Sequence, residues 1–390
     1  MSAVKLPLPD SVVIPMAMHI GAPAKPVVKV GDYVKTGQLI GEPGGFVSAP
    51  IYASVSGTVK KIGEMLGSNG RMMQTVEIES DGLDARWEGI APPKLETMQD
   101  FLDAVRASGL VGLGGAGFPT VVKLTVKNLD QIKCVIINGA ECEPYITSDH
   151  REALENGENV LHGVYKIKEI LGVHRVLIAI EDNKPDAIEA LRKIADNAAL
   201  DPNDEVRVLP LRAMYPQGAE KVLVQACTGR RVPAGGLPAD VGCLVMNIAS
   251  VSFLASYMKT GMPLTLKRVT VDGSAVQNPQ NVIVPVGTKI AALMEFCGGY
   301  REEPKKIIMG GPMMGVAVTT DELPVLKQNN GLLAFGAREA QLMEPTECIR
   351  CGRCVAACPM RLLPTRLEKY AERRDVEALK SLDIMSCMEC

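Results

Sequence analysis

The sequence predicts a multidomain α/β protein, and three observations support this prediction. Short β-branched segments separated by glycine-containing turns fill the first part of the chain, and the middle part alternates apolar strands with amphipathic helices. Six of the eleven cysteines fall within residues 348–390. Such changes of pattern along 390 residues indicate several domains, each with its own core.

The composition excludes some classes of protein. Apolar residues make up 47% and charged residues 22%, which is ordinary for a globular chain. A formal net charge of -3 and only 4% aromatic residues argue against a nucleic-acid partner. No apolar run approaches the roughly 20 residues that a membrane-spanning helix needs, so we expect no direct membrane span and association with a membrane only through partners. The opening residues MSAVKLPLPD lack the features of a secretory signal.

Residues 1–88 are predicted to form the first domain. The stretch PVVKVGDYVKTGQLIGEPGGFVSAPIYASVSGTVKKI contains short alternating strands with Gly-Asp, Thr-Gly, Pro-Gly-Gly and Ser-Gly turn signals. Its paired halves VGDYVKTGQLI and ASVSGTV resemble the biotinyl/lipoyl barrel-sandwich family, in which a lysine on the hairpin carries a swinging cofactor. Residues 41–52 of this chain contain no lysine, so we expect a docking scaffold in place of a carrier.

Residues 95–261 are predicted to form an α/β domain. A helix is expected over 95–109, a buried strand over 133–144, a strand over 175–182, a helix over 184–198 and a strand over 206–211. This alternation predicts a mostly parallel sheet with its ligand at the carboxyl ends of the strands. The first helix is followed by GLVGLGGAGFPTVVKL, where Gly112, Gly114 and Gly117 have the spacing that lets backbone N–H groups approach a phosphate. An ordinary glycine-rich loop is the alternative.

Two further domains follow. Residues 262–325 show short strands around one helix, expected over 288–297, and resemble the soluble-ligand-binding β-grasp module. Residues 332–390 are expected to be helical and basic around the cysteines, as a ferredoxin-like iron–sulfur segment, with the charged spacer RLEKYAERRDVEALKSL presenting a solvated face.

The cysteine spacing predicts iron–sulfur clusters. Cys348, Cys351 and Cys354 are spaced C-x2-C-x2-C and Cys358 follows with a proline behind it, as in bacterial two-cluster ferredoxins. In such runs the fourth cysteine ligates the other cluster, so two 4Fe-4S clusters are expected. Cys387 and Cys390 look like the start of a second run, which leaves both ligand sets incomplete and suggests truncation within the motif. Zinc and disulfides are the alternatives. The compact spacing fits a zinc site poorly, and disulfides need an oxidising compartment, whereas the opening residues lack a secretory signal.

Four blocks carry a closer resemblance. GLGGAGFPTVVK, NGAECEP, YPQGAEK and MNIAS resemble, in this order, the FMN- and NADH-binding blocks of the flavin subunit of respiratory complex I. With the other modules, the chain is similar over nearly its whole length to the RnfC family, the soluble flavin- and cluster-bearing member of the Rnf ion-translocating electron-transport complex. The resemblance implies a peripheral subunit at the cytoplasmic face of a bacterial membrane, with membrane and ferredoxin-like subunits as partners. It also implies electron transfer between NAD(H), FMN and clusters during ferredoxin oxidation and NAD reduction, coupled to ion transport.

The resemblance also assigns roles to individual residues. It places glycines under the flavin phosphate and the nicotinamide cofactor, Phe118 as a wall and Lys123 as a phosphate-balancing cation. Asparagines are implied at the flavin, and acids at the NADH side. The residues implied for cofactor binding are Gly112, Gly114, Gly115, Gly117, Phe118, Lys123, Asn138, Glu141, Glu143, Tyr215, Gly218, Glu220 and Asn247.

Two departures from the complex I pattern leave alternatives open. Ala140 and Ala219 stand where that pattern has acids, which weakens the case for NADH more than the case for FMN. A cobalamin reductase of the bacterial microcompartment type has the same module order. A non-catalytic, cluster-bearing adaptor with a decayed nucleotide site is the third hypothesis.

Overall fold

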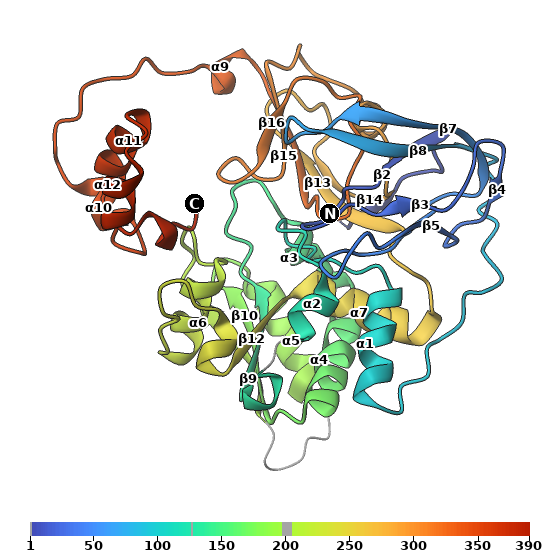
Figure 1. Ribbon diagram of the computed structural model, residues 1–390, viewed down its shortest axis with the longest axis horizontal. Helices are drawn as coiled ribbons and strands as arrows, with labels where there is room; N and C mark the ends of the chain where they lie inside the picture. The colour runs from blue at the N-terminus through green and yellow to red at the C-terminus, as the bar shows by residue number, and fades with distance from the viewer. Residues whose placement is uncertain (1, 126–127, 197–204) are drawn as a thin grey trace.

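The computed structural model describes residues 2–125, 128–196 and 205–390. The described residues form four sheets, two in the N-terminal unit, one in the α/β unit and one in the unit that follows (Figure 1). None of the described helices has the length and apolar character needed to cross a membrane.

The N-terminal unit is a sandwich of two antiparallel sheets, which confirms the prediction of a small sandwich of short strands. One sheet has the order β2-β8-β7-β4 and the other β3-β5-β6. Valine and isoleucine side chains, such as Val12, Ile14, Val76 and Ile78, fill the space between them. The strands are β2 (Ser11–Pro15), β3 (Lys25–Pro26), β4 (Tyr33–Val34), β5 (Leu39–Glu42), β6 (Ile51–Tyr52), β7 (Gly57–Leu66) and β8 (Met72–Ser80).

The α/β unit has a parallel four-stranded sheet in the order β11-β10-β9-β12, as the alternation of strands and helices predicts. Strands β9, β10 and β12 are buried on both faces, which explains the continuous apolar run of β9. Val135 and Ile137 of β9 face one helical layer, whereas Cys134 and Ile136 face α6. The strands are β9 (Cys134–Gly139), β10 (Arg175–Glu181), β11 (Glu205–Leu211) and β12 (Cys243–Asn247).

The helices of this unit agree with the sequence in part. Helix α1 begins after a capping box between Thr97 and Asp100 and ends before Gly109, whose φ of +68° suits glycine. The strand expected over 133–144 is shorter, because β9 ends at Gly139. The helix expected over 184–198 is α5, and residues 197–198 lie outside the described residues. The helices are α1 (Met98–Ala107), α2 (Thr120–Leu124), α3 (Ser148–Glu155), α4 (Gly157–Leu171), α5 (Pro185–Asp196), α6 (Glu220–Thr228) and α7 (Ile248–Thr260), with 3-10 turns η1 (Leu129–Gln131) and η2 (Pro238–Val241).

The third unit is built on a mixed six-stranded sheet in the order β1-β14-β13-β17-β15-β16. The expected helix over 288–297 is α8 (Ile290–Phe296). The expectation of helix from Leu332 onward is wrong at its start, because Gly331–Phe335 forms β17, fully buried between β13 and β15. A short apolar run buried on both faces has no period that separates strand from helix. The strands are β1 (Val4–Lys5), β13 (Leu266–Asp272), β14 (Gln280–Pro285), β15 (Lys306–Met309), β16 (Val316–Val318) and β17.

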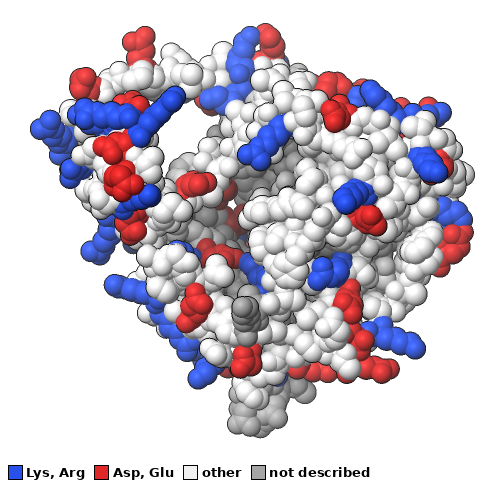
Figure 2. All heavy atoms as spheres, viewed as in Figure 1, with Lys and Arg blue, Asp and Glu red and all other residues white. Residues whose placement is uncertain are grey.

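The C-terminal segment is helical, as expected for the remainder of the chain. Residues 341–352 have no helix or strand and lead away from the sheet to a small group of helices (Figure 1). Lysine and arginine side chains, mixed with acids, project from these helices into solvent, as expected of the charged spacer (Figure 2). The helices are α9 (Ala337–Ala340), α10 (Arg353–Ala357), α11 (Pro364–Glu372) and α12 (Val376–Ser381), followed by η3 (Ile384–Ser386).

Candidate functional site

The glycine loop, residues 112–117, is a tight turn between α1 and α2. The Gly112 N–H donates to the Phe118 carbonyl at 2.9 Å, and the Gly117 N–H donates to the Gly112 carbonyl at 3.2 Å. Gly115 and Gly117 have φ values of +117° and +63°, which side chains other than glycine rarely adopt. Residues 114–116 are exposed, and their backbone N–H groups donate to no other described residue. These N–H groups are therefore available to an anionic ligand.

The loop lies at the carboxyl end of the parallel sheet. Asn138 is the last residue but one of β9, Asn247 is the last residue of the neighbouring strand β12, and the two are register partners. A Cβ at Gly114 would lie 2.8 Å from Asn247 Nδ2, so the loop touches this asparagine. Asn138 Nδ2 donates to the Gly218 carbonyl at 2.9 Å, which ties the end of β9 to the loop before α6. The structure thus brings the two asparagines, the glycine loop and Gly218 to one edge, where ligands of open α/β sheets bind.

Lys123 and Glu220, expected to serve a phosphate and NADH, are paired with each other. Lys123 on α2 donates to the Glu220 carboxylate at the start of α6 and to the Val245 carbonyl at 3.0 Å. Phe118, which follows the glycine loop, is half-buried. The pair lies beside β12, because Lys123 also donates to the carbonyl of Val245 in that strand.

The two glutamates of the segment after β9 differ in their contacts. Glu141 is buried and accepts from the backbone N–H groups of Asp149 at 2.8 Å and His150 at 3.1 Å, at the start of α3. Burial raises the pKa of its carboxyl above the ordinary value, although these hydrogen bonds oppose the shift. Glu143 instead accepts from the N–H groups of Met313 at 3.0 Å and Met314 at 2.7 Å, in the turn between β15 and β16. Neither glutamate is an ordinary solvated carboxylate.

A cavity of about 380 Å³ lies next to these glutamates. Its walls include Glu143, Glu181, Lys184 and Tyr215. The Tyr215 hydroxyl is buried and has no hydrogen-bond partner among the described residues. Burial, followed by the negative charges of Glu143, Cys390 and Cys142, raises the pKa of Tyr215 to about 12. An unpartnered hydroxyl at a polar cavity is a group that a bound ligand can satisfy.

The two C-x2-C pairs that begin at Cys348 and Cys387 each start in a loop of the same local form. Arg350 and Glu389, each two residues after the first cysteine of a C-x2-C pair, have φ values of +56° and +55°. Each donates its backbone N–H at 3.4 Å to that cysteine, Arg350 to Cys348 Sγ and Glu389 to Cys387 Sγ. The Leu362 N–H donates to Cys358 Sγ at the same distance.

This donor set fits iron–sulfur ligation. Thiolate ligands with backbone N–H groups directed at the sulfurs are what such clusters require. Cys358 and Cys387 are near enough to Cys390 for their charges to help raise its pKa, after the larger effect of burial. Among the described residues, no group of three or more His, Cys, Asp or Glu side chains is drawn together closely enough to hold a single metal ion.

Several contact residues of the site were not found from the sequence. Leu113 donates its N–H to Ser250 Oγ and accepts from Lys267 Nζ, and Asn247 Nδ2 donates to Asp149. For one of them, Lys267, the alternation of buried and less buried positions along β13 offers a signal in the sequence. Lys267 shares a strand face with Val269 and Val271, so a lysine stands in a row of buried positions.

Matches to four family models cover most of the chain. They are the RnfC Barrel sandwich hybrid domain over residues 2–83, the Nuo51 FMN-binding domain over 105–256, the SLBB domain over 268–317 and the 4Fe-4S dicluster domain over 341–390. The protein is therefore of the class that combines an FMN-binding domain with an iron–sulfur domain.

The relatives narrow this class to one family. The chain is 43% identical to the C subunit of the Na(+)-translocating ferredoxin:NAD(+) oxidoreductase complex of Acetobacterium woodii, over 97% of this chain and 85% of the relative. It is 44% identical to the C subunit of the proton-translocating ferredoxin:NAD(+) oxidoreductase complex of Clostridium ljungdahlii, over 94% and 80%. The chain belongs to the RnfC family, which confirms the resemblance seen in the sequence.

Among solved structures, NAD+-reducing [NiFe]-hydrogenase in the H2-reduced state has a similar fold. The TM-score is 0.52 at 20% identity, covering 62% of this chain and 47% of that chain. This likeness concerns the fold alone.

Proposed function

We propose that this chain is the peripheral electron-transfer subunit of an ion-translocating ferredoxin:NAD oxidoreductase complex, passing electrons between NAD(H), FMN and two 4Fe-4S clusters. Family membership supports the complex, and the FMN-binding and dicluster matches support the cofactors. Its domains are 1–88 (barrel-sandwich), 95–261 (Rossmann-like, for FMN and NADH), 262–325 (β-grasp) and 332–390 (ferredoxin-like). Its place is the cytoplasmic face of the membrane, against membrane and ferredoxin-like partner subunits.

One observation carries the proposal: the cysteine segment meets the flavin domain at its candidate site. The charge of Cys390 is among the causes of the raised pKa of Tyr215, which lines the cavity beside Glu143. The chain end lies beside the segment that leads to α6 (Figure 1). Electron transfer between a flavin and a cluster requires that the two lie close together. A metal-binding domain with no role at the flavin would not need to lie there.

In the proposed site, the chain supplies binding and orientation. The free N–H groups of residues 114–116 would hold the FMN phosphate, and Asn138 and Asn247 would orient the flavin at the ends of β9 and β12. FMN, when bound, exchanges two electrons with a nicotinamide and single electrons with clusters. Cys348, Cys351 and Cys354 would ligate one cluster, and Cys358, Cys387 and Cys390 the other.

The nicotinamide would occupy the cavity lined by Glu143 and Tyr215. The ribose hydroxyls of the cofactor can donate to the Glu143 carboxylate. The unpartnered Tyr215 hydroxyl can donate a hydrogen bond to the cofactor. Lys123 and Glu220 are now paired with each other. Glu220 would become free to contact NADH once Lys123 turns away from it to the FMN phosphate.

A second candidate is the cluster-bearing adaptor without a nicotinamide site. It is favoured by the fact that Glu143 already uses both carboxylate oxygens on Met313 and Met314, and Glu220 is paired with Lys123. Under this hypothesis FMN and clusters bind, but electrons arrive from another donor.

Anaerobic reconstitution separates the two candidates. The full chain is loaded with FMN, iron and sulfide, NADH is added, and flavin absorbance and the EPR signals of reduced clusters are followed together. Bleaching of the flavin with reduced-cluster signals supports the electron-transfer subunit. Clusters that dithionite reduces but NADH does not would overturn it in favour of the adaptor.

A further inference from the structure

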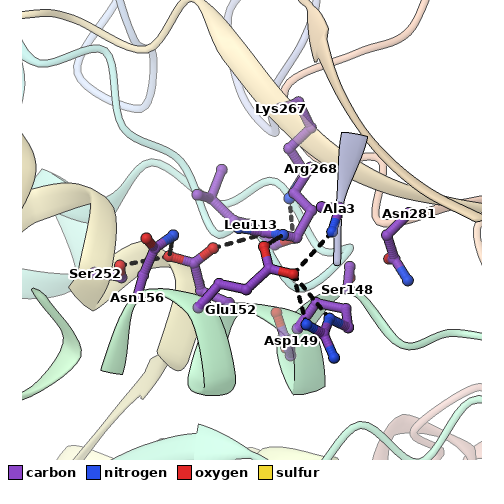
Figure 3. A network of polar contacts seen from close by, with 12 residues as sticks. Ala3, Leu113, Ser148, Asp149, Glu152, Asn156, Ser252, Lys267, Arg268 and Asn281 are labelled. Atoms are coloured by element: carbon purple, nitrogen blue, oxygen red, sulfur yellow. Dashed lines mark hydrogen bonds and ion pairs between the residues drawn. The ribbon is translucent and has the colours of Figure 1, made fainter. Parts of the chain in front are cut away.

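The glycine loop is fixed by a closed ring of polar contacts around Leu113. The Leu113 N–H donates to Ser250 Oγ at 3.0 Å, and its carbonyl accepts from Lys267 Nζ at 2.8 Å. Lys267 lies on β13 of the third unit, which contains the SLBB match at 268–317 and is called the SLBB domain here. It reaches Leu113 across the boundary between two domains (Figure 3). Both backbone groups of the residue that precedes Gly114 are therefore held by side chains from elsewhere in the chain.

Asn247 and Asp149 complete the ring. Asn247 Oδ1 accepts from the Ser250 N–H at 3.1 Å, and its Nδ2 donates to Asp149 Oδ2 at 2.6 Å. No hydrogen bond or ion pair joins Asp149 to Lys267 among the described residues, so the ring is closed at this point only by the attraction between their charges. The second N–H of the Asn247 amide stays available for a ligand, so this asparagine belongs to both the ring and the binding edge.

The two ionisable side chains of the ring, Asp149 and Lys267, are buried, so their charged forms are costly. Asp149 and Lys267 are 7% and 4% exposed, so neither charge is well solvated. Burial lowers the pKa of Lys267 to about 8, although the charges of Asp149, Glu152 and Glu141 oppose the shift. Burial and then the charge of Glu141 raise the pKa of Asp149 to about 7.

The other charges in the neighbourhood have partners of their own. Arg268 pairs with Glu152 at 3.0 Å, and also binds Glu155. Glu141 caps α3, and its backbone carbonyl accepts from Lys184. Lys267 is therefore the cation whose donor is directed at the glycine loop, and Asp149 is the carboxylate directed at Asn247.

We propose that Lys267 of the SLBB domain and Asp149 of α3 are positioning residues of the flavin site, which hold the glycine loop and Asn247 in the geometry that binds FMN. This inference rests on the proposed function, because it assumes that the loop binds FMN. The inference gives the SLBB domain a direct part in the site, because Lys267 of its strand β13 binds the backbone of the glycine loop at Leu113. Removing Lys267 frees the Leu113 carbonyl and takes away the positive charge that lowers the pKa of the buried Asp149.

The structure offers a matched control. Lys327 is also a buried lysine, 1% exposed, and it also donates to backbone carbonyls of other domains, Pro50 O at 2.7 Å and Gly109 O at 2.8 Å. It contacts neither residues 112–117 nor the two asparagines in any described hydrogen bond. Replacing it removes a buried lysine and its hydrogen bonds without touching the proposed ring.

The experiment compares Lys267→Met, Lys267→Arg, Asp149→Asn and Lys327→Met in the full chain. FMN affinity is measured by fluorescence quenching, the potential of the bound flavin by redox titration, and folding by thermal unfolding. We expect Lys267→Met and Lys327→Met to lower Tm similarly, whereas only Lys267→Met weakens FMN binding, by more than tenfold, and shifts the flavin potential. Lys267→Arg keeps the positive charge and an N–H donor, so its FMN affinity should stay within a few fold of the wild-type value.

Each other outcome overturns a specific claim. Equal losses of FMN affinity in Lys267→Met and Lys327→Met would reduce Lys267 to a structural residue, and wild-type affinity in Lys267→Met would remove its role entirely. If Lys267→Met does not fold, Asp149→Asn decides: unchanged FMN affinity and potential would refute the ring. A wild-type chain that binds no FMN would instead refute the proposed function itself.

Discussion

The proposed flavin site and the cysteine segment, residues 341–390, are built in opposite ways. Leu113 and Lys267, which meet at the glycine loop, are 154 residues apart, and Lys327 donates to Pro50 across 277 residues. In the cysteine segment the N–H···S contacts span two to four residues. Leu362 and Leu367 are its buried hydrophobic residues. The first site depends on the packing of three domains, whereas the second depends on local loops whose stability a bound cluster must supply.

The largest effect should come from the cysteine run. Cys351→Ala removes a ligand that no neighbouring side chain can replace, so the first cluster is lost and iron content falls by about half. FMN binding should not change, because the flavin site lies in the domains before residue 332. Iron and FMN analysis of the reconstituted chain tests this, with the half-buried Cys227→Ala as the control. Loss of FMN in Cys351→Ala would show that the two regions fold together.

A smaller but still large effect is expected at the glycine loop. In Gly114→Val the Cβ alone would lie 2.8 Å from Asn247 Nδ2, so the loop or the asparagine must move. FMN affinity should fall at least about 100-fold, the equivalent of about 2.7 kcal/mol, with clusters retained. Gly45→Val, at an exposed position of the N-terminal hairpin, should bind FMN like the wild type. Loss of clusters along with FMN would contradict the separation of the two sites.

The contrast between local and long-range contacts also explains which features could be predicted from the sequence. The cysteine pairs were found from spacing alone, because a cluster loop is made by neighbours in sequence. Asn138 and Asn247 required the resemblance, and the parallel sheet explains why they meet, as register partners at the ends of β9 and β12. Strand β17 was missed because a buried run of five apolar residues has no distinguishing period.

The supports of the flavin site could not be predicted. The contact of Lys267 with Leu113 is a product of domain packing, and no local pattern of residues 112–117 contains it. Likewise Glu143 was expected at the NADH side, and its bonds to Met313 and Met314 depend on where the turn between β15 and β16 lies. Local chemistry names candidate residues, whereas tertiary packing decides their partners.

A moderate effect is expected at this turn. Glu143→Gln keeps the size of the side chain, but it removes the charge and replaces one of the two accepting oxygens by an NH2 group, which cannot accept from the Met313 or Met314 N–H. Loss of about 1.4 kcal/mol would raise the hydrogen-exchange rates of these two amides about tenfold. Glu303→Gln, at an exposed position of the same unit, should leave these rates unchanged. Unchanged exchange in Glu143→Gln would mean that packing, and not Glu143, holds the turn.

The last effect grows gradually with pH and concerns the lysine that joins the domains. Burial lowers the pKa of Lys327 from 10.5 to about 7, and a neutral amine still offers two N–H donors for the carbonyls of Pro50 and Gly109. Between these pH values the unfolded chain binds the proton and the folded chain does not. The free energy of unfolding therefore gains up to about 1.4 kcal/mol per pH unit from this group as the pH rises.

Lys327→Met lacks this contribution, so its stability relative to the wild type should decline from pH 7 to pH 9 in urea denaturation of the full chain. The cysteine segment offers no comparable buried lysine among its described residues, and its unfolding should show no such difference between the two proteins. Parallel stability curves would mean that Lys327 stays protonated in the folded state. In that case the two carbonyls, which stabilise an ammonium more than an amine, outweigh the cost of burying its charge.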